Sequence, residues 1–462
     1  MALAAAAGLR TALAPWVAWP AWLAGILPVL AGVLALQLLL GSGRPQLVPV
    51  LVVGTATLGL ALLPMGASAL LHLAAGLAVL LGTAAAAMSV RHHPALQLPA
   101  PTGTYIVGSS LLEPAVPGGP AIQIWHPAAK PAGVLMPYRA EAGKAASWHA
   151  PAAATAAWLD APPASGGPFP VVIYLPGWGG NRQQNTALLQ DIASHGYAVV
   201  AADPWNGGTA DPTGTADLVA PLDLSSAPAF ERTLEVGRRN AKRQARHAGM
   251  ILDSLIAQVA AGHPISAVAN TRRAALLGYS FGGAGAVETA ATDSRFRAVV
   301  NLDGWVFTDA YDRGIRQPYI LLSSDAPPPS SEDLRATEPL RRHTAELTTW
   351  DLQGLCANLV RHGGWFATVR GSSHEDFSDA PWTMPWPLFK GHDAERHRWH
   401  VIRETVVQFL DLHLAERQMT TSAVPASPEL VIEAWSPAGD ATSSNQCGVS
   451  AAMRPGERHA IR

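Results

Sequence analysis

Ser280 is the residue of this chain whose surroundings best suit nucleophilic attack on a carbonyl carbon. It lies in the run Gly278-Tyr279-Ser280-Phe281-Gly282, which has the G-x-S-x-G pattern of a nucleophile elbow. An apolar run over residues 274–277 precedes the pattern, and a run rich in small residues, 285–291, follows it. A strand, a sharp turn and a helix in this order would expose the serine hydroxyl, and the glycines would leave room for neighbouring backbone. The alternative is a glycine-rich turn that carries an ordinary serine.

A nucleophilic serine needs a base within hydrogen-bond reach and an acid that orients the base. In α/β-hydrolases these residues follow the chain order serine, aspartate or glutamate, histidine. His374 has the position expected of the base, because it lies between the last predicted strand and the closing helix. The neighbouring histidines fit this role less well because they precede that strand or lie in or beside the closing helix: His343, His362, His392, His397 and His400.

Two aspartates compete for the role of the acid. Asp303 follows the predicted strand 298–302, directly after the helix of the nucleophile, and Asp325 follows the next predicted strand, 319–322. Topology by itself slightly favours Asp325, because many α/β-hydrolases carry the acid after the later strand. The positions of the two residues in the chain leave both open.

Three short blocks resemble the catalytic blocks of the platelet-activating factor acetylhydrolase family, the plasma type related to lipoprotein-associated phospholipase A2. They are Gly-Tyr-Ser-Phe-Gly-Gly at 278–283, Asn-Leu-Asp-Gly-Trp at 301–305 and Gly-Ser-Ser-His-Glu-Asp-Phe at 371–377. In that family the acid lies in a Leu-Asp-x-Trp block, so the resemblance implies Asp303. The chain departs from the family at Tyr279, where the animal enzymes usually carry histidine, and in the long segment 325–364.

An oxyanion hole for such a serine requires two backbone N–H donors. The first is expected from Phe281, the residue after the nucleophile. The second is expected from the glycine-rich segment 175–180, which follows an apolar strand and occupies the place of a His-Gly-Leu-Gly block in the family. The resemblance therefore implies Trp178 as the second donor. The alternative is a glycine-rich turn without a catalytic role.

Apolar runs separated by helical patterns predict one α/β domain at residues 96–419. The runs are short, continuous and bounded by turn residues, which is typical of parallel strands covered on both faces: 171–175, 198–202, 274–277, 298–302, 319–322 and 366–369. Helical patterns over 232–259 and 395–414 lie between or after them. The expected fold is an α/β-hydrolase with a doubly wound, mostly parallel sheet.

The first 95 residues have a different composition. Arg10 and Arg44 are the only charged side chains before Arg91, and a membrane-spanning helix needs about 20 apolar residues. The sequence therefore predicts an all-helical transmembrane region at 1–95, with three spans near 16–40, 47–63 and 67–89. The expected localisation is a multi-pass position in a bacterial inner membrane, with the lipid bilayer as a partner. The face of the membrane that carries the hydrolase domain stays open.

Other segments give weaker signals. Residues 420–462 are rich in Ser, Pro, Ala and Gly, and we expect them to be disordered. Residues 381–389, rich in Trp and Pro, could form an apolar lid, a wall of the acyl pocket or a packed loop. The basic residues of 238–246 are typical of a solvated helix face. The alternative is a face that meets anionic lipid headgroups. The formal net charge of −2 gives no reason to expect nucleic acid.

These residues predict a serine ester hydrolase that forms an acyl-serine at Ser280, with His374 as base and Asp303 as acid. The chemistry implies no metal or organic cofactor. The resemblance implies short-acyl phospholipids or related lipid esters as substrates. Two alternatives stay open: a carboxylesterase of the dienelactone-hydrolase or polyester type, and a catalytically idle membrane receptor or scaffold on a hydrolase fold. An intact triad in family order argues against the idle protein. The sequence gives no oligomeric state.

Overall fold

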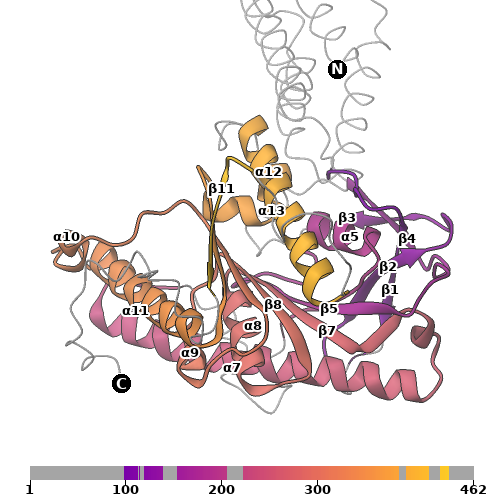
Figure 1. Cartoon of the computed structure of the whole chain (residues 1–462), viewed down its shortest axis with the longest axis horizontal. Helices are drawn as coiled ribbons and strands as arrows, with labels where there is room; N and C mark the ends of the chain where they lie inside the picture. The colour runs from indigo at the N-terminus through magenta and orange to yellow at the C-terminus, as the bar shows by residue number, and fades with distance from the viewer. Residues whose placement is uncertain are drawn as a thin grey trace, which may run out of the picture. The chain divides into compact units, whose positions relative to one another are not determined.

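The computed structural model of the chain describes residues 98–112, 114, 119–138, 153–204, 222–383, 392–415 and 427–435. The chain divides into two compact units, and nearly all of the described residues belong to one of them. This unit consists of Leu98–Met136, Ala154–Trp382 and Gly391–Arg462. It is described by itself below (Figure 1).

One mixed β-sheet forms the centre of the unit, in the order β11-β10-β9-β8-β7-β5-β6-β2-β1-β4-β3. Neighbouring strands from β6 to β10 are parallel, whereas β2 and β11 flank this parallel part in antiparallel orientation. The strands are β1 (Ile106–Leu112), β2 (Ile122–Ala128), β3 (Leu135–Tyr138), β4 (Ala153–Leu159), β5 (Phe169–Leu175), β6 (Ala198–Ala202), β7 (Ala269–Tyr279), β8 (Phe296–Leu302), β9 (Tyr319–Ser323), β10 (Gly364–Val369) and β11 (Leu430–Trp435). This arrangement fits the predicted α/β-hydrolase sheet.

Helices cover both faces of the parallel strands. They are α5 (Thr186–Ser194), α7 (Ala227–Ala260), α8 (Phe281–Thr292), α9 (Ala310–Arg313), α10 (Ser331–Leu334), α11 (Pro339–His362), α12 (Ala380–Thr383) and α13 (His392–His413), with short 3-10 turns η2 (Pro264–Ala267) and η3 (His374–Phe377). Side chains of each strand alternate between the faces. In β5, Val172 and Tyr174 join a core layer with α5 and α13, whereas Ile173 and Leu175 join a layer with α7, α8 and α11. Burial on both faces explains the continuous apolar runs in the sequence.

β4 and β11 are among the strands that come from segments in which the sequence did not predict a strand. β4 lies in an alanine-rich stretch without an apolar run typical of a strand, and it pairs in parallel with β1 at Val107 and Ala157. β11 lies within 420–462, where we expected disorder, and it pairs antiparallel with β10. Alanine has a low strand propensity, and a six-residue run in a polar tail gives little periodicity. The neighbouring strand in space determines both assignments.

The predicted transmembrane region is not supported by the described structure. The three expected spans near 16–40, 47–63 and 67–89 lie outside the described residues. Among the residues that are described, no helix combines the length and the apolar character needed to cross a membrane. The long helix α7, for example, carries Arg238, Arg239 and Lys242, and such charges are costly in hydrocarbon. Within the described residues, this finding contradicts the all-helical transmembrane part of the fold class and the multi-pass membrane localisation, and it gives no support for the bilayer as partner.

Asp351, on α11, is a buried carboxyl that the sequence did not single out. It is 4% exposed and accepts the backbone N–H of Val306 at 2.8 Å. Val306 follows Asp303 by three residues, so this bond fixes the loop after β8 to α11. Burial raises the pKa of Asp351 to about 7, and the bond from Val306 opposes the shift.

This raised pKa gives a prediction about stability and pH. The folded state holds the proton of Asp351 more tightly than the unfolded state, so the stability that it contributes is lost as pH rises through about 7. Asp351→Asn keeps an acceptor for Val306 and stays neutral. We expect the variant to lose less unfolding free energy than the wild type between roughly pH 5 and pH 8, measured by urea unfolding. Asp312→Asn, at an exposed position, is the control, and equal pH slopes for Asp351→Asn and the wild type would contradict the prediction.

Candidate active site

Ser280 occupies a sharp turn between the end of β7 and the start of α8. Its φ of 54° and ψ of −123° lie in a region that side chains rarely adopt, as strained functional residues often do. A Cβ on Gly278 would lie 2.0 Å from the carbonyl oxygen of Gly282, and a Cβ on Gly282 would lie 1.9 Å from that of Leu175. Both glycines of the pattern are therefore required by close backbone contacts.

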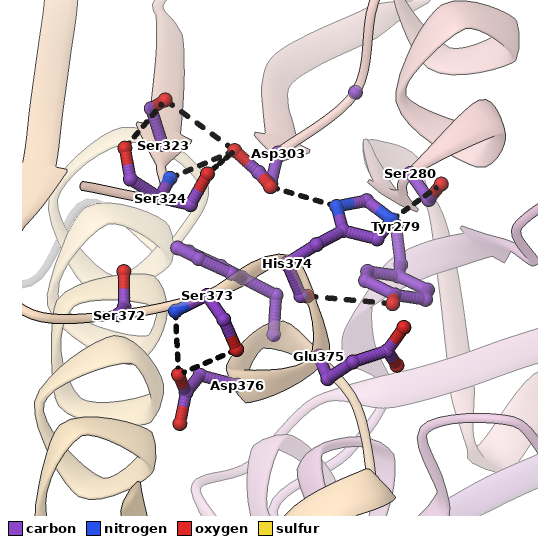
Figure 2. A network of polar contacts seen from close by, with 12 residues as sticks. Tyr279, Ser280, Asp303, Ser323, Ser324, Ser372, Ser373, His374, Glu375 and Asp376 are labelled. Atoms are coloured by element: carbon purple, nitrogen blue, oxygen red, sulfur yellow. Dashed lines mark hydrogen bonds and ion pairs between the residues drawn. The ribbon is translucent and has the colours of Figure 1, made fainter. Parts of the chain in front are cut away.

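His374 lies between Ser280 and Asp303, as Figure 2 shows. Its Nε2 is 2.9 Å from Ser280 Oγ, and its Nδ1 is 2.7 Å from Asp303 Oδ2. The imidazole comes from the first residue of η3, after β10, and the other two residues follow β7 and β8. Because parallel strands end at the same edge of the sheet, residues far apart in sequence meet there. The structure thus brings the three predicted residues into one hydrogen-bonded chain.

Asp303 is held by backbone and side-chain donors around its carboxylate. Its Oδ1 accepts the N–H of Ser324 at 2.7 Å and the hydroxyls of Ser324 and Ser323 at 3.0 and 3.3 Å. Its own N–H donates to Leu322 O at 2.8 Å, and its backbone has a φ of 52°. The donors on Oδ1 leave Oδ2 directed at the imidazole of His374. The two serines were missed by the sequence reading because they belong to the end of another strand.

Asp325, the competing aspartate, has a different contact. Its Oδ2 accepts the N–H of Gly371 at 2.8 Å, and its backbone N–H donates to Ser372 O at 3.1 Å. It therefore fastens the loop that carries His374, whereas the imidazole contacts Asp303. Both aspartates follow strands at the same sheet edge, which explains why their chain positions could not separate them.

Tyr279 supports His374 from the side of the nucleophile. Its ring stacks on the imidazole with centroids 5.2 Å apart and planes 25° apart, and its hydroxyl donates to His374 O at 3.4 Å. The phenol is buried, which raises the pKa of Tyr279 and keeps the donor neutral. The sequence reading noted Tyr279 only as a departure from the family. Its contact with the base gives this residue a place in the site.

The pKa of His374 results from opposing effects. Burial lowers the pKa, whereas the hydrogen bond and the charge of Asp303 raise it, and the charge of Glu375 adds to the rise. The net result is a pKa above the ordinary value of 6.5. An imidazole that gains a proton more readily is a stronger base for the serine hydroxyl.

The two expected oxyanion residues lie next to each other. Phe281 is the first residue of α8, where a backbone N–H has no acceptor within its own helix. Trp178 follows β5, and its ring meets that of Phe281 edge to face with centroids 4.6 Å apart. A Cβ on Gly177 would lie 3.2 Å from the Cβ of Ser280, so the backbone before Trp178 closely approaches the nucleophile. The two expected donors therefore both lie close to Ser280.

Two further segments singled out in the sequence have packed parts. Trp382, in the segment 381–389, meets Trp399 edge to face at 5.6 Å, and the guanidinium of Arg396 lies 4.7 Å from its ring. Residues 384–391 lie outside the described residues.

On α7, Arg243 is 9% exposed and donates to Asn240 at 2.9 Å. The basic residues of this helix therefore do not form one continuous solvated face.

Comparisons with known proteins agree with this geometry. The sequence model of the family described as platelet-activating factor acetylhydrolase, isoform II, matches residues 263–420, the region of Ser280, Asp303 and His374. The platelet-activating factor acetylhydrolase of Bos taurus is 30% identical over 193 residues, which cover 37% of this chain and 43% of that protein. The protein of the same name from Canis lupus familiaris is 24% identical over 263 residues, covering 52% and 55%. The chain thus spans about half the length of the curated relatives it matches.

A solved structure gives independent support for the fold. A ferulic acid esterase from Streptomyces cinnamoneus superposes with a TM-score of 0.50 at 23% identity, over 73% of this chain and 99% of that protein. At this identity the likeness concerns the fold alone. For the region that carries the three catalytic blocks, the predicted resemblance to the platelet-activating factor acetylhydrolase family is confirmed by the family match and the curated relatives.

Proposed function

We propose that this chain hydrolyses carboxylic esters through a covalent acyl-serine intermediate at Ser280. The observation that carries the proposal is the pair of hydrogen bonds at His374, 2.9 Å to Ser280 and 2.7 Å to Asp303. Serine, histidine and aspartate in this geometry are the parts of an acyl-transfer triad. A catalytically idle protein on the same fold would have no need of a strained serine joined to an oriented base.

The proposed reaction has two halves. His374 Nε2 takes the proton of Ser280 as Oγ attacks the ester carbonyl, and Asp303 stabilises the imidazolium that forms. The negative charge on the carbonyl oxygen is met by the N–H groups of Phe281 and Trp178. His374 then gives the proton to the departing alkoxide, which leaves an acyl-serine. In the second half a water molecule loses a proton to His374 and attacks the acyl-serine. His374 then returns this proton to Ser280 Oγ as the bond between Oγ and the acyl group breaks, which releases the acid.

The proposed substrates are short-acyl phospholipids or related lipid esters. The support is the family match, since the relatives are named for the acetyl ester of platelet-activating factor. The alternative is a carboxylesterase of the dienelactone-hydrolase or polyester type, for which the ferulic acid esterase offers only a shared fold. A panel of acetyl and longer-chain p-nitrophenyl esters together with a short-acyl phosphatidylcholine distinguishes the two. Hydrolysis of the nitrophenyl esters without hydrolysis of the phospholipid would favour the alternative.

Ser280→Ala tests the nucleophile. Because Oγ forms the bond to the acyl group, we expect the variant to lose on the order of 10⁵-fold in kcat and to fail to react with a fluorophosphonate probe. The measurement is ester turnover together with probe labelling followed by peptide mapping. Ser254→Ala, on α7, is the matched control and should behave as the wild type. Labelling of Ser280→Ala at the wild-type rate would show that another residue is the nucleophile.

A pair of variants tests the acid. Asp303→Asn leaves the imidazole in the wrong tautomer and removes its charge partner, so we expect kcat to fall by roughly 10³ to 10⁴ with little change in KM. Asp325→Asn disturbs only the bond to Gly371 and should cost less than roughly tenfold. Circular dichroism establishes first that both variants fold. The reverse order of losses would assign the acid to Asp325.

The raised pKa of His374 predicts the acidic limb of the pH profile. The base must be neutral to accept the serine proton, so kcat/KM should fall as pH drops through a pKa above 6.5. Glu375→Gln removes one of the charges that raise this pKa, so its acidic limb should lie at lower pH than that of the wild type. The measurement is kcat/KM from about pH 5 to pH 9. An unmoved limb in Glu375→Gln would mean that this charge does not act on His374.

A further inference from the structure

The loop that follows β5 carries Trp178, and the direction of the Trp178 N–H depends on two successive peptide groups. The inference developed here rests on the proposed function, because the loop matters for catalysis only if this N–H receives the oxyanion. The first peptide group joins Pro176 to Gly177, and the second joins Gly177 to Trp178. Each is planar, with its C=O and N–H pointing in opposite directions. A hydrogen bond at one end of such a group therefore fixes the direction of the group at the other end.

The first peptide group is held at both ends by glutamine side chains. Gln244 Nε2 donates to Pro176 O at 3.1 Å, and Gly177 N donates to Gln184 Oε1 at 2.7 Å. A carbonyl oxygen needs a donor and an N–H needs an acceptor, so these partners also fix which way each side-chain amide faces. Pro176 and Gly177 are both buried, where an unpaired peptide group is costly.

The second peptide group is held at its carbonyl end. Gly180 N donates to Gly177 O at 3.0 Å, which leaves the Trp178 N–H directed to the opposite side. Gln184 also fills the inside of this turn, since a Cβ on Gly180 would lie 2.1 Å from Gln184 Oε1. The glutamine thus supports both peptide groups, one by a hydrogen bond and one by packing.

The two glutamines connect the loop to the rest of the site. Gln244 lies on α7 and packs against α8, because a Cβ on Gly285 would lie 2.2 Å from Gln244 Oε1. Gln184 lies just before α5, and its neighbour Asn185 donates to Phe377 O at 2.8 Å. Phe377 ends η3, which begins at His374. The loop is therefore tied to the helix of the nucleophile on one side and to the turn of the base on the other.

We propose that Gln184 and Gln244 are positioning residues that hold the Trp178 N–H in the direction of the oxyanion. Gln184 acts as an acceptor and Gln244 as a donor, on opposite ends of the same peptide group. Preorganised donors stabilise the transition state because they need no rearrangement when charge develops. Loosening the clamp should therefore weaken binding of the oxyanion more than binding of the substrate.

Substitutions of similar size, made in the full chain, test whether Gln184 acts as an acceptor and Gln244 as a donor. Gln184→Met and Gln244→Met remove the polar groups, whereas glutamate keeps an acceptor and has no amide donor. The readouts are kcat, KM and the inhibition constant of a short-chain trifluoromethyl ketone. Ser280 Oγ adds to the carbonyl carbon of this ketone, and the proton of Oγ passes to His374. The oxygen of the ketone then carries a negative charge. The corresponding trifluoromethyl alcohol cannot form the oxyanion and measures ordinary binding. Gln258→Met, elsewhere on α7, is the matched control.

We expect both methionine variants to lose roughly ten- to a hundredfold in kcat, with KM within about twofold of the wild type. The ketone should bind more weakly by a similar factor, and the alcohol should bind unchanged. The activities of the glutamate and methionine variants should rank in opposite order at the two positions. Gln184→Glu should retain more activity than Gln184→Met, whereas Gln244→Glu should retain no more than Gln244→Met, because its carboxylate faces a carbonyl oxygen.

The outcomes separate this proposal from the proposed function. An active wild type whose methionine variants keep wild-type kcat and ketone binding would overturn the clamp and leave the esterase assignment intact. Equal losses of binding for the ketone and the alcohol would show that the glutamines only pack against the loop. The same would follow if the glutamate and methionine variants ranked in the same order at both positions. If a methionine variant fails to fold, the glutamate pair still decides the polarity. A wild type that neither hydrolyses esters nor reacts with the ketone would overturn both proposals.

Discussion

The backbone turn at Ser280 is the constraint on which the rest of the site depends. Its φ of 54° is tolerated because three glycines around it carry no side chain. A Cβ on Gly278 or Gly304 would lie 2.0 Å from a backbone oxygen, and one on Gly282 would lie 1.9 Å from another. The N–H of Ser280 also donates to Leu302 O at 2.7 Å. The turn therefore joins β7, β8 and α8 and fixes the serine hydroxyl relative to the strand that leads to Asp303.

The parallel sheet supplies the other groups from the ends of its strands. β8 leads to one aspartate, β9 to the serines and the aspartate that follow it, and β10 to the loop of the base. The two aspartates divide the work: Asp303 contacts the imidazole of His374, and Asp325 binds the backbone of the loop that presents it. Side chains outside the chain of Ser280, His374 and Asp303, such as Ser324, Gln184 and Asp325, thus account for much of the geometry.

Opposing electrostatic effects set the pKa of His374, the proposed base. His374 is half-exposed at its side chain, 43%, whereas Asp303 is 12% exposed. Burial disfavours the charged imidazolium, and the carboxylates of Asp303 and Glu375 favour it more strongly. The stacked ring of Tyr279 limits where the imidazole can turn. The imidazole of His374 is therefore both more basic and oriented, which is what the proposed proton transfer from the Ser280 hydroxyl requires.

The sequence by itself determined the nucleophile motif, the parallel strands and the position of His374, because local periodicity and glycine spacing encode them. The three blocks also led to the family resemblance. Only the tertiary structure decided which aspartate contacts the imidazole, since Asp303 and Asp325 end adjacent strands and have equivalent places in the chain. It also decided that the tail segment Leu430–Trp435 is a strand and that Gln184 and Gln244 meet at one peptide group. The bond of Gln244 to Pro176 joins residues 68 positions apart. The physical reason that sequence patterns miss such contacts is that periodicity reports burial along one element, whereas hydrogen-bond partners depend on how elements pack.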